Sequence, residues 1–281
     1  MVVIFAAGMF AAVCGYPAPD PVKVFMKERR SQHGEDLYVF QEFYQSNLSR
    51  IKAAAGVYIE AGALDGRDLS NTWALNKAFG WTGILIEASP ALFKSLQKNR
   101  QGSGDVLVHG ALCNPKDARR NVTYHYVDNE VKNTAVGGIW ELMDEGFKEA
   151  FYKRFAIDDA KLQTYPTVKC MSLASELHSR GVHHVDYFSL DIEGAELNFL
   201  SHFSYALHKG NVTIDIISVE GYGDSVTPKD MQVRVLLNGV GYTFVGWGVK
   251  QPAYGWGSMW FLRNASAVHV EYFGWNRDKK R

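Results

Sequence analysis

Cysteine is scarce in this chain, with 3 residues in 281, at positions 14, 113 and 170. None of them forms a C-x-x-C pair or joins a cluster with histidine, so the sequence offers no zinc site. If the first segment is a cleaved leader, Cys14 is removed with it and Cys113 and Cys170 remain. These two thiols can form a disulfide in an oxidising compartment. Alternatively they are two buried free thiols, which behave as small hydrophobic side chains.

Neither sign of charge is in excess, since 30 lysine and arginine residues balance 30 aspartate and glutamate residues. Nonspecific binding to nucleic acid depends on a basic surface, so we expect no nucleic-acid partner. The basic cluster Asp278–Arg281 belongs to a polar tail expected over residues 271–281.

Long hydrophobic runs are also missing. Residues 1–15 are uncharged and almost wholly apolar, but a helix needs about 20 such residues to span a bilayer, so no spanning segment is expected. The length suits the apolar region of a signal peptide, and a buried N-terminal helix is the alternative. Four N-x-[ST] sequons agree with a secretory location in the endoplasmic reticulum or Golgi lumen, or with secretion. They lie at Asn47, Asn121, Asn211 and Asn264.

The G-x-G-x-x-G loop of dinucleotide-binding proteins is missing as well. In its place an apolar run ends at Glu60 and is followed by Gly62 and Gly66, and a second apolar run ends at Glu87. Such runs suit strands of a parallel sheet, whose carboxyl edge binds ligands. Glu87 can accept hydrogen bonds from both hydroxyls of a ribose. Acids beside the glycine loop suit a ligand with a cationic centre, so the pattern predicts a site for S-adenosylmethionine.

Two further expected strands end in acids, at Asp191 and at Glu220. Buried charges are unfavourable without partners, so four acidic strand ends at one edge indicate a site. Asp191 and Glu193 are candidates for a general base or for binding the cofactor's ammonium. If a divalent cation is used, they are its candidate ligands together with Glu220. The alternative for Glu193 and Glu196 is favourable charge at a helix N-terminus.

Strand and helix patterns alternate along the chain. They predict one α/β domain over 35–270, preceded by a linker or N-terminal arm over 16–34 and interrupted by an insertion at about 128–166, which is either a lid or a packing arm. Strands are expected at 57–60, 83–87, 105–110, 122–127, 167–171, 185–190, 213–219, 242–246 and 258–262. Helices are expected at 35–51, 68–79, 90–100, 173–180, from 191 onward, and at 228–237. The predicted sheet is mostly parallel, with an antiparallel strand in a C-terminal hairpin.

Three parts of the sequence resemble FkbM-type methyltransferases: Ser31–Asp36, then Ser70–Thr72 with Gly80–Glu87, and Tyr187–Glu196. The similarity extends from about Ser31 to Arg263, and its Val185–Leu190 variant resembles animal members, including the Star-like proteins. The resemblance implies a Rossmann-like class I methyltransferase fold with a seven-stranded sheet, and S-adenosylmethionine as the cofactor. Bacterial relatives methylate hydroxyls on sugars and natural products.

The resemblance also implies roles for individual residues. It assigns to the cofactor Glu60, Gly62, Ala63, Asp65, Gly66, Asn71, Glu87, Ala88, Ala111 and Asp191. It assigns catalysis to Asp191 and Glu193. His33 is a further candidate base because its ordinary pKa is near neutrality. The implied activity is O-methylation of a glycan or a small secretory-pathway molecule. The alternative is an inactive protein of this fold with a binding or trafficking role, whereas the loop spacing disfavours a nucleotide-dependent oxidoreductase.

Overall fold

The computed structural model describes residues 19–41, 55–114, 116, 120–126, 136–152, 164–222, 227–247 and 256–263. The expected leader over 1–15, the tail over 271–281 and the sequons at Asn47 and Asn264 lie outside these residues. Within the described ranges, no helix is both long enough and apolar enough to cross a membrane.

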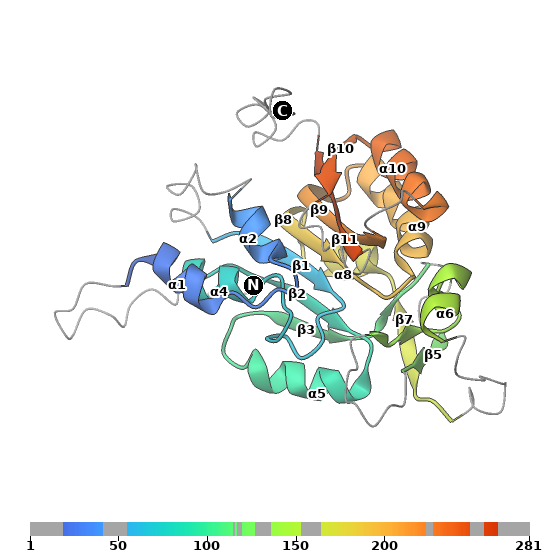
Figure 1. Cartoon of the computed structure of the whole chain (residues 1–281), viewed down its shortest axis with the longest axis horizontal. Coiled ribbons are helices and arrows are strands. Elements are labelled where there is room, and N and C mark those ends of the chain that lie inside the picture. Colours follow the sequence, from blue (N-terminus) through green and yellow to red (C-terminus); the bar gives the residue numbers. More distant parts are fainter. Residues whose placement is uncertain are drawn as a thin grey trace.

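A seven-stranded sheet runs through the centre of the molecule (Figure 1). In spatial order its strands are β10 (Tyr242–Trp247), β11 (Trp256–Arg263), β9 (Thr213–Tyr222), β8 (His184–Leu190), β1 (Val57–Ala61), β2 (Thr82–Glu87) and β3 (Val106–His109). Neighbours pair in parallel, except that β11 is antiparallel to both β9 and β10. The structure therefore confirms the predicted mostly parallel sheet with an antiparallel strand in a C-terminal hairpin.

Helices cover both faces of this sheet (Figure 1). One face carries α8 (Leu173–Ser179), α9 (Glu196–His208) and α10 (Pro228–Gly239). The other carries α1 (Pro21–Glu28), α2 (Glu35–Val39), α4 (Trp73–Phe79) and α5 (Pro90–Asn99). Successive strand residues point to opposite faces, so Ile59 of β1 packs in the first core and Tyr58 in the second.

Capping residues in the sequence mark where two of these helices begin. Ser89 accepts a hydrogen bond from the Leu92 N–H, and Pro90 occupies the first turn of α5. Thr227 and Asp230 form a reciprocal capping box at the start of α10. These caps satisfy N–H groups that a helix start leaves unpaired, and the observed helices agree with the ranges predicted at 90–100 and 228–237.

A second, four-stranded sheet lies beside the first and is made of short strands. Its order is β4 (Ala111–Leu112), β7 (Thr167–Met171), β5 (Asn121–His125) and β6 (Gly138–Ile139). The strands expected at 122–127 and 167–171 belong to this sheet instead of extending the main one. Helix α6 (Glu145–Phe151) follows β6 within the predicted insertion. Cys113 and Cys170 form a disulfide with 5.4 Å between their Cα atoms, which joins the end of β4 to β7.

Several predicted boundaries are corrected by the structure. The expected linker over 16–34 contains α1, whose Phe25 is fully buried. Helix α4 begins at Trp73 and not at residue 68, because the residues before it form a loop at the sheet edge. Strand β9 continues to Tyr222, so Glu220 lies inside a strand and not just beyond one. The helix expected from 191 begins at Glu196.

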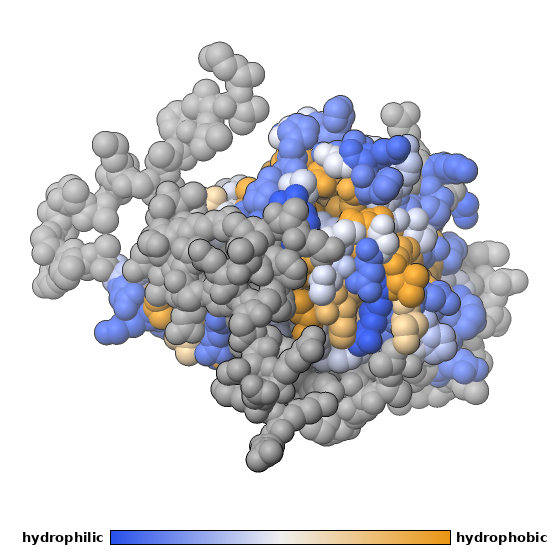
Figure 2. All heavy atoms as spheres, turned by 90° about the horizontal axis from the view of Figure 1, so that it is seen from above, coloured by the Kyte–Doolittle hydropathy of each residue, from blue (hydrophilic) through white to orange (hydrophobic). Residues whose placement is uncertain are grey.

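The surface over α9 and α10 is mixed in character. Figure 2, which looks down from the side of α10 and β10, shows hydrophobic surface between hydrophilic strips on the described part of this face. Met231 and Val235 are 50% and 65% exposed and lie one turn apart on α10, and Tyr205 of α9 is 65% exposed. Scattered apolar exposure of this kind is normal for a folded protein.

His125, at the end of β5, packs among the rings of Trp140, Tyr152 and Tyr165 and is 1% exposed. Neither ring nitrogen has a hydrogen-bond partner in the described chain. A buried polar group without a partner costs about 1–3 kcal/mol. We therefore expect His125→Phe to raise the free energy of unfolding by about 1 kcal/mol at pH 7.5, as measured by urea denaturation.

The gain in the free energy of unfolding from His125→Phe should be larger at pH 5 than at pH 7.5. Burial lowers the pKa of His125 to about 4, whereas a histidine in the unfolded chain titrates near 6.5. The wild type therefore loses stability as the pH falls from about 6.5 to 4, because the unfolded state binds the proton first. The phenylalanine variant lacks this loss. A variant less stable than the wild type at both pH 7.5 and pH 5 would contradict the prediction.

Candidate functional site

A cavity of about 480 Å³ lies at the carboxyl ends of β1, β2, β8 and β9. These ends meet at one edge because the strands run parallel. Small-molecule sites commonly measure about 300–1,000 Å³. The predicted site residues that line the cavity are His33, Glu60, Gly62, Asn71, Glu87, Ala88, Ala111, Asp191, Glu193 and Glu220.

Three residues predicted to contact the cofactor lie behind the cavity wall instead. Ala63 is 1% exposed and packs in the core under α4 and α5. The Asp65 carboxylate accepts two backbone N–H groups of its own loop. Gly66 has φ +76°, and a Cβ there would lie 2.3 Å from the side chain of Leu96 in α5. All three shape the loop and do not line the cavity.

Gly62 brings the first loop against the end of β8. Its φ is +81°, a conformation that glycine adopts without strain. A Cβ at this position would lie 1.7 Å from the carbonyl oxygen of Asp191. The Gly62 and Ala63 N–H groups both donate to the Ile86 carbonyl, which joins the loop to β2. Only glycine fits here, so the loop backbone itself forms this wall of the cavity.

Glu87 ends β2 and is 4% exposed. Its Oε2 accepts a hydrogen bond from the Leu64 N–H at 2.8 Å, and its Oε1 accepts one from the Ser89 N–H at 2.6 Å. Burial raises the pKa of Glu87 to about 7, against the lowering effect of these N–H donors. Each carboxylate oxygen has a second lone pair. The two backbone contacts therefore orient Glu87 and leave acceptor capacity toward the cavity.

Glu60 is bound from within the protein. Its Oε1 accepts the Asn71 N–H at 2.7 Å, and its Oε2 accepts the hydroxyls of Ser70 at 2.9 Å and Thr72 at 2.5 Å. The guanidinium of Arg100 lies 3.6 Å away. Sequence reasoning places Glu60 against the cofactor, but the structure makes its carboxylate the anchor of the loop that precedes α4.

Arg100 is a residue that sequence reasoning misses. Its side chain is fully buried and donates to the Gly66 carbonyl at 2.5 Å and to Asp105 at 3.0 Å. It also donates to the hydroxyls of Tyr58, Ser70 and Thr72. An arginine at the end of a helix usually lies in solvent, so the sequence gives little signal. In the structure Arg100 ties α5, β1, β3 and the loop before α4 together beneath the cavity.

The other end of the cavity is strongly acidic. The pKa of Asp191 is raised to about 7, chiefly by burial and further by Glu196 and Glu35, while a hydrogen bond from the Glu220 carboxyl opposes the rise. Burial, followed by the neighbouring Asp191, also raises the pKa of Glu193 and Glu220. The backbone of Glu193 has φ +56°, and such strained conformations gather at functional sites.

A divalent cation does not fit this end well. The structure brings donor atoms of Asp191, Glu196 and Glu220 within 4.8 Å of one another, so Glu196 takes the place predicted for Glu193. Glu196, however, already accepts the N–H groups of Ile192 and Gly194, and its other oxygen lies 2.5 Å from the Lys229 ammonium. Lys229 thus supplies the positive charge that a metal would bring.

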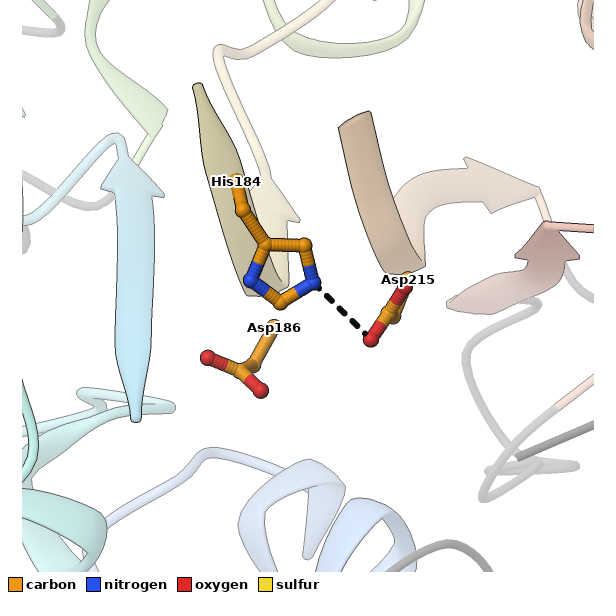
Figure 3. A group of neighbouring side chains, drawn as sticks. All are labelled: His184, Asp186 and Asp215. Carbon is orange, nitrogen blue, oxygen red and sulfur yellow. Dashed lines mark hydrogen bonds and ion pairs between the residues drawn. The ribbon is translucent and has the colours of Figure 1, made fainter. Parts of the chain in front are cut away.

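A second group of possible metal ligands lies at the opposite edge of the main sheet (Figure 3). His184 and Asp215, at the amino ends of β8 and β9, are 3.1 Å apart. Asp186 accepts the Val57 N–H at 2.8 Å, and the Arg263 guanidinium lies 3.6 Å from Asp215. These contacts join strand starts far from the cavity, and the guanidinium beside Asp215 opposes cation binding.

Several polar atoms in the cavity wall are buried without partners. Among the described residues, His33 Nδ1, Asn71 Oδ1 and Asp191 Oδ1 have no hydrogen-bond partner. Native proteins rarely leave buried polar atoms unpaired. These atoms, from the turn before α2, the loop before α4 and the end of β8, therefore indicate that a ligand with hydrogen-bonding groups completes the wall.

Comparison with known proteins agrees with this geometry. The model of the methyltransferase FkbM domain matches residues 60–244, which is more than half of the chain. The chain belongs to the FkbM methyltransferase family. The matched region includes both acidic strand ends, Glu60 and Glu87, and the segment from Asp191 to Glu220. A comparison with curated proteins finds no match.

Three solved structures match the chain at low sequence identity. The METTL16 methyltransferase domain has a TM-score of 0.47 at 10% identity, and the match covers 82% of this chain and 66% of that one, just under two thirds. An O-methyltransferase from Bacillus cereus in complex with SAH has a TM-score of 0.42 at 11% identity, covering 89% and 94%. Fibrillarin from Aeropyrum pernix with bound S-adenosyl-L-methionine has a TM-score of 0.40 at 9% identity, covering 75% and 68%.

The FkbM domain is an S-adenosylmethionine-dependent methyltransferase, and the cavity suits that cofactor. Glu87, oriented by two N–H donors, has free acceptor capacity that would suit the ribose hydroxyls. The Gly62 loop lets the backbone approach the ligand closely. Asn71 Oδ1 is an acceptor that the cofactor's ammonium would satisfy. When bound, the cofactor would supply an activated methyl group, and these residues of the chain would hold and align it.

Proposed function

We propose that this FkbM methyltransferase methylates a hydroxyl of a glycan or a small molecule in the secretory pathway. The proposal depends on the observation that two acidic residues with different surroundings, Glu87 and Asp191, line the same cavity. Glu87 lies at one end, placed for a ribose, and Asp191 lies at the other with a buried, unpartnered oxygen. Methyl donor and acceptor can therefore meet in one enclosed space, and alignment of two reactants contributes about 7–11 kcal/mol to catalysis.

Asp191 is the residue we assign as general base. The acceptor oxygen forms the new bond to the methyl carbon while the bond from that carbon to sulfur breaks. The proton of the acceptor hydroxyl passes to the Asp191 carboxylate, and the products are a methyl ether and S-adenosylhomocysteine. A pKa of about 7 suits this role, because a base works best when its pKa is near the operating pH.

Two observations support the secretory location. A disulfide joins Cys113 and Cys170, and such bonds persist mainly in oxidising compartments. The sequon residues Asn121 and Asn211 both have exposed side chains, as glycosylation requires.

The test is calorimetric titration of S-adenosylmethionine into the wild type and Glu87→Ala. We expect the variant to bind about 10- to 100-fold more weakly, because hydrogen bonds to a charged acceptor contribute about 1.5–3 kcal/mol. Glu176→Ala is the matched control, since its carboxylate pairs with Arg180 on the surface of α8. This variant should bind as the wild type does.

Thermal unfolding of all three proteins verifies that they are folded. A folded wild type that binds no S-adenosylmethionine would overturn the enzymatic function and favour the alternative, an inactive Star-like protein with a binding or trafficking role. Equal affinity of the wild type and Glu87→Ala would remove Glu87 from the cofactor site.

A further inference from the structure

The cavity wall is rich in acidic side chains. Its described lining contains six acidic side chains and neither lysine nor arginine: Glu35, Glu60, Glu87, Asp191, Glu193 and Glu220. The whole chain is balanced, with 30 basic and 30 acidic residues. The concentration of acidic groups is therefore a local property of this cavity.

Two of the six acids already have a role, one as the anchor of a loop and one in the cofactor site. Glu60 lies 3.6 Å from Arg100 and accepts two hydroxyls. Glu87 accepts two backbone N–H groups and is placed for the cofactor ribose. Neither of these acids determines what enters the rest of the cavity.

The other four acids gather at the acceptor end, which we define as Glu35, Asp191, Glu193 and Glu220. Glu35 lies in the first turn of α2, is 6% exposed, and has one oxygen bonded to the His33 N–H at 2.9 Å. Asp191 and Glu193 follow β8, and Glu220 lies in β9. Three separate elements thus bring carboxyl groups to one space, and each contributes hydrogen-bond acceptors.

The cation beside this end offsets its negative charge only in part, although it lowers the pKa of both Asp191 and Glu193. The Lys229 ammonium lies 2.5 Å from Glu196 and 3.2 Å from Asp144, neither of which lines the cavity. The cofactor brings a sulfonium and an ammonium but also a carboxylate, so its net positive charge offsets only part of the excess. Asp191 Oδ1, buried and without a donor, points to a further donor group in the ligand.

The following inference rests on the proposed function. We propose that the methyl acceptor is a hydroxylated amine, such as an amino sugar. Its ammonium binds at the acceptor end while its hydroxyl faces Asp191. An ammonium donates three hydrogen bonds and accepts none, which matches a wall of carboxyl groups. A phosphate or a carboxylate in the same place would repel those carboxyl groups that are ionised and would raise the pKa values of all of them further, which disfavours binding. The cavity therefore selects against phosphorylated sugars, nucleotides and uronic acids.

The experiment compares three related sugars on the protein saturated with S-adenosylhomocysteine. Glucosamine, N-acetylglucosamine and glucuronic acid share a pyranose ring and carry a cation, no charge and an anion, respectively, at pH 7. We expect calorimetry to show glucosamine binding at least about tenfold more tightly than N-acetylglucosamine, with glucuronic acid weakest. Glu35→Gln and Glu220→Gln should each reduce the advantage of glucosamine, whereas Glu176→Gln on α8 should not.

The outcomes separate this inference from the function on which it rests. If S-adenosylhomocysteine binds but glucosamine has no advantage, or no sugar binds, the acceptor class is wrong and the methyltransferase site stands. The inference is also overturned if glucosamine still binds more tightly than N-acetylglucosamine to the same extent in both Glu35→Gln and Glu220→Gln while these variants are folded. If S-adenosylhomocysteine itself fails to bind, the proposed function falls and this inference falls with it.

Discussion

Arg100→Met is expected to lower the free energy of unfolding by about 3–5 kcal/mol, as measured by urea denaturation at pH 7.5. The substitution keeps an unbranched side chain in the buried space but removes every hydrogen bond of the guanidinium. Glu60 and Asp105 then lose their cation, and the Gly66 carbonyl loses a donor at 2.5 Å. Removing one member of a buried ion pair is strongly destabilising because the other charge stays buried without compensation.

Arg180→Met is the matched control. Arg180 pairs with Glu176 on the surface of α8, and its side chain is 39% exposed. Exposed pairs contribute about 0–1 kcal/mol, so this variant should stay close to the wild type. A loss below about 1 kcal/mol in Arg100→Met would show that the network beneath the cavity is not important for stability.

The pH dependence gives an independent check. Burial raises the pKa of Glu60, and Arg100 opposes that rise. Without Arg100 the folded-state pKa rises further, so the folded variant binds a proton where the wild type does not. A raised carboxyl pKa destabilises the folded state only above the ordinary value of about 4.5. The deficit of Arg100→Met should therefore shrink as the pH falls from 7.5 toward 5.

The strands of the main sheet can be predicted because the residues that mark each strand are adjacent in the sequence. Each apolar run of four to six residues ending in an acid identifies a buried parallel strand and its carboxyl end, as at Glu60 and Glu87. The second sheet is different. Strands β4 and β6 have two residues each, and only pairing with residues distant in sequence makes them strands. No periodicity marks so short a segment.

The residues of the candidate site likewise include some that the sequence predicts and some that it does not. Gly62, Glu87 and Asp191 follow strands directly, so the topology alone brings them to the cavity. Asp65 and Gly66 follow the same strand but do not line the cavity. The φ values within the loop decide which residues reach the cavity, and residue type alone does not reveal those φ values. Lys229 and Arg100 act through partners more than 25 residues away in sequence, at Glu196 and Gly66. Such pairings exist only after the chain has folded.

Asp191→Asn is expected to reduce the rate of methyl transfer by about 10²–10⁴-fold, the usual contribution of a general base. Asparagine keeps the size of the side chain and the Asp191 N–H bond to the Ala61 carbonyl, so the fold and the affinity for S-adenosylmethionine should change much less. Transfer of a radiolabelled methyl group to an accepted hydroxyl compound measures the rate. Asp68→Asn, at a side chain that is 72% exposed, is the control.

The pH profile decides whether Asp191 is the base. Its pKa is raised to about 7, chiefly by burial and further by Glu196 and Glu35, against the lowering effects of Glu220 and Lys229. A base must be ionised to accept a proton, so the wild-type rate should rise with pH to a plateau above about 7, and Asp191→Asn should lose this rise. His33 also lines the cavity, with Nδ1 unpartnered. If the rise persists in Asp191→Asn and disappears in His33→Gln, the base is His33, and the carboxyl groups at the acceptor end act in binding alone.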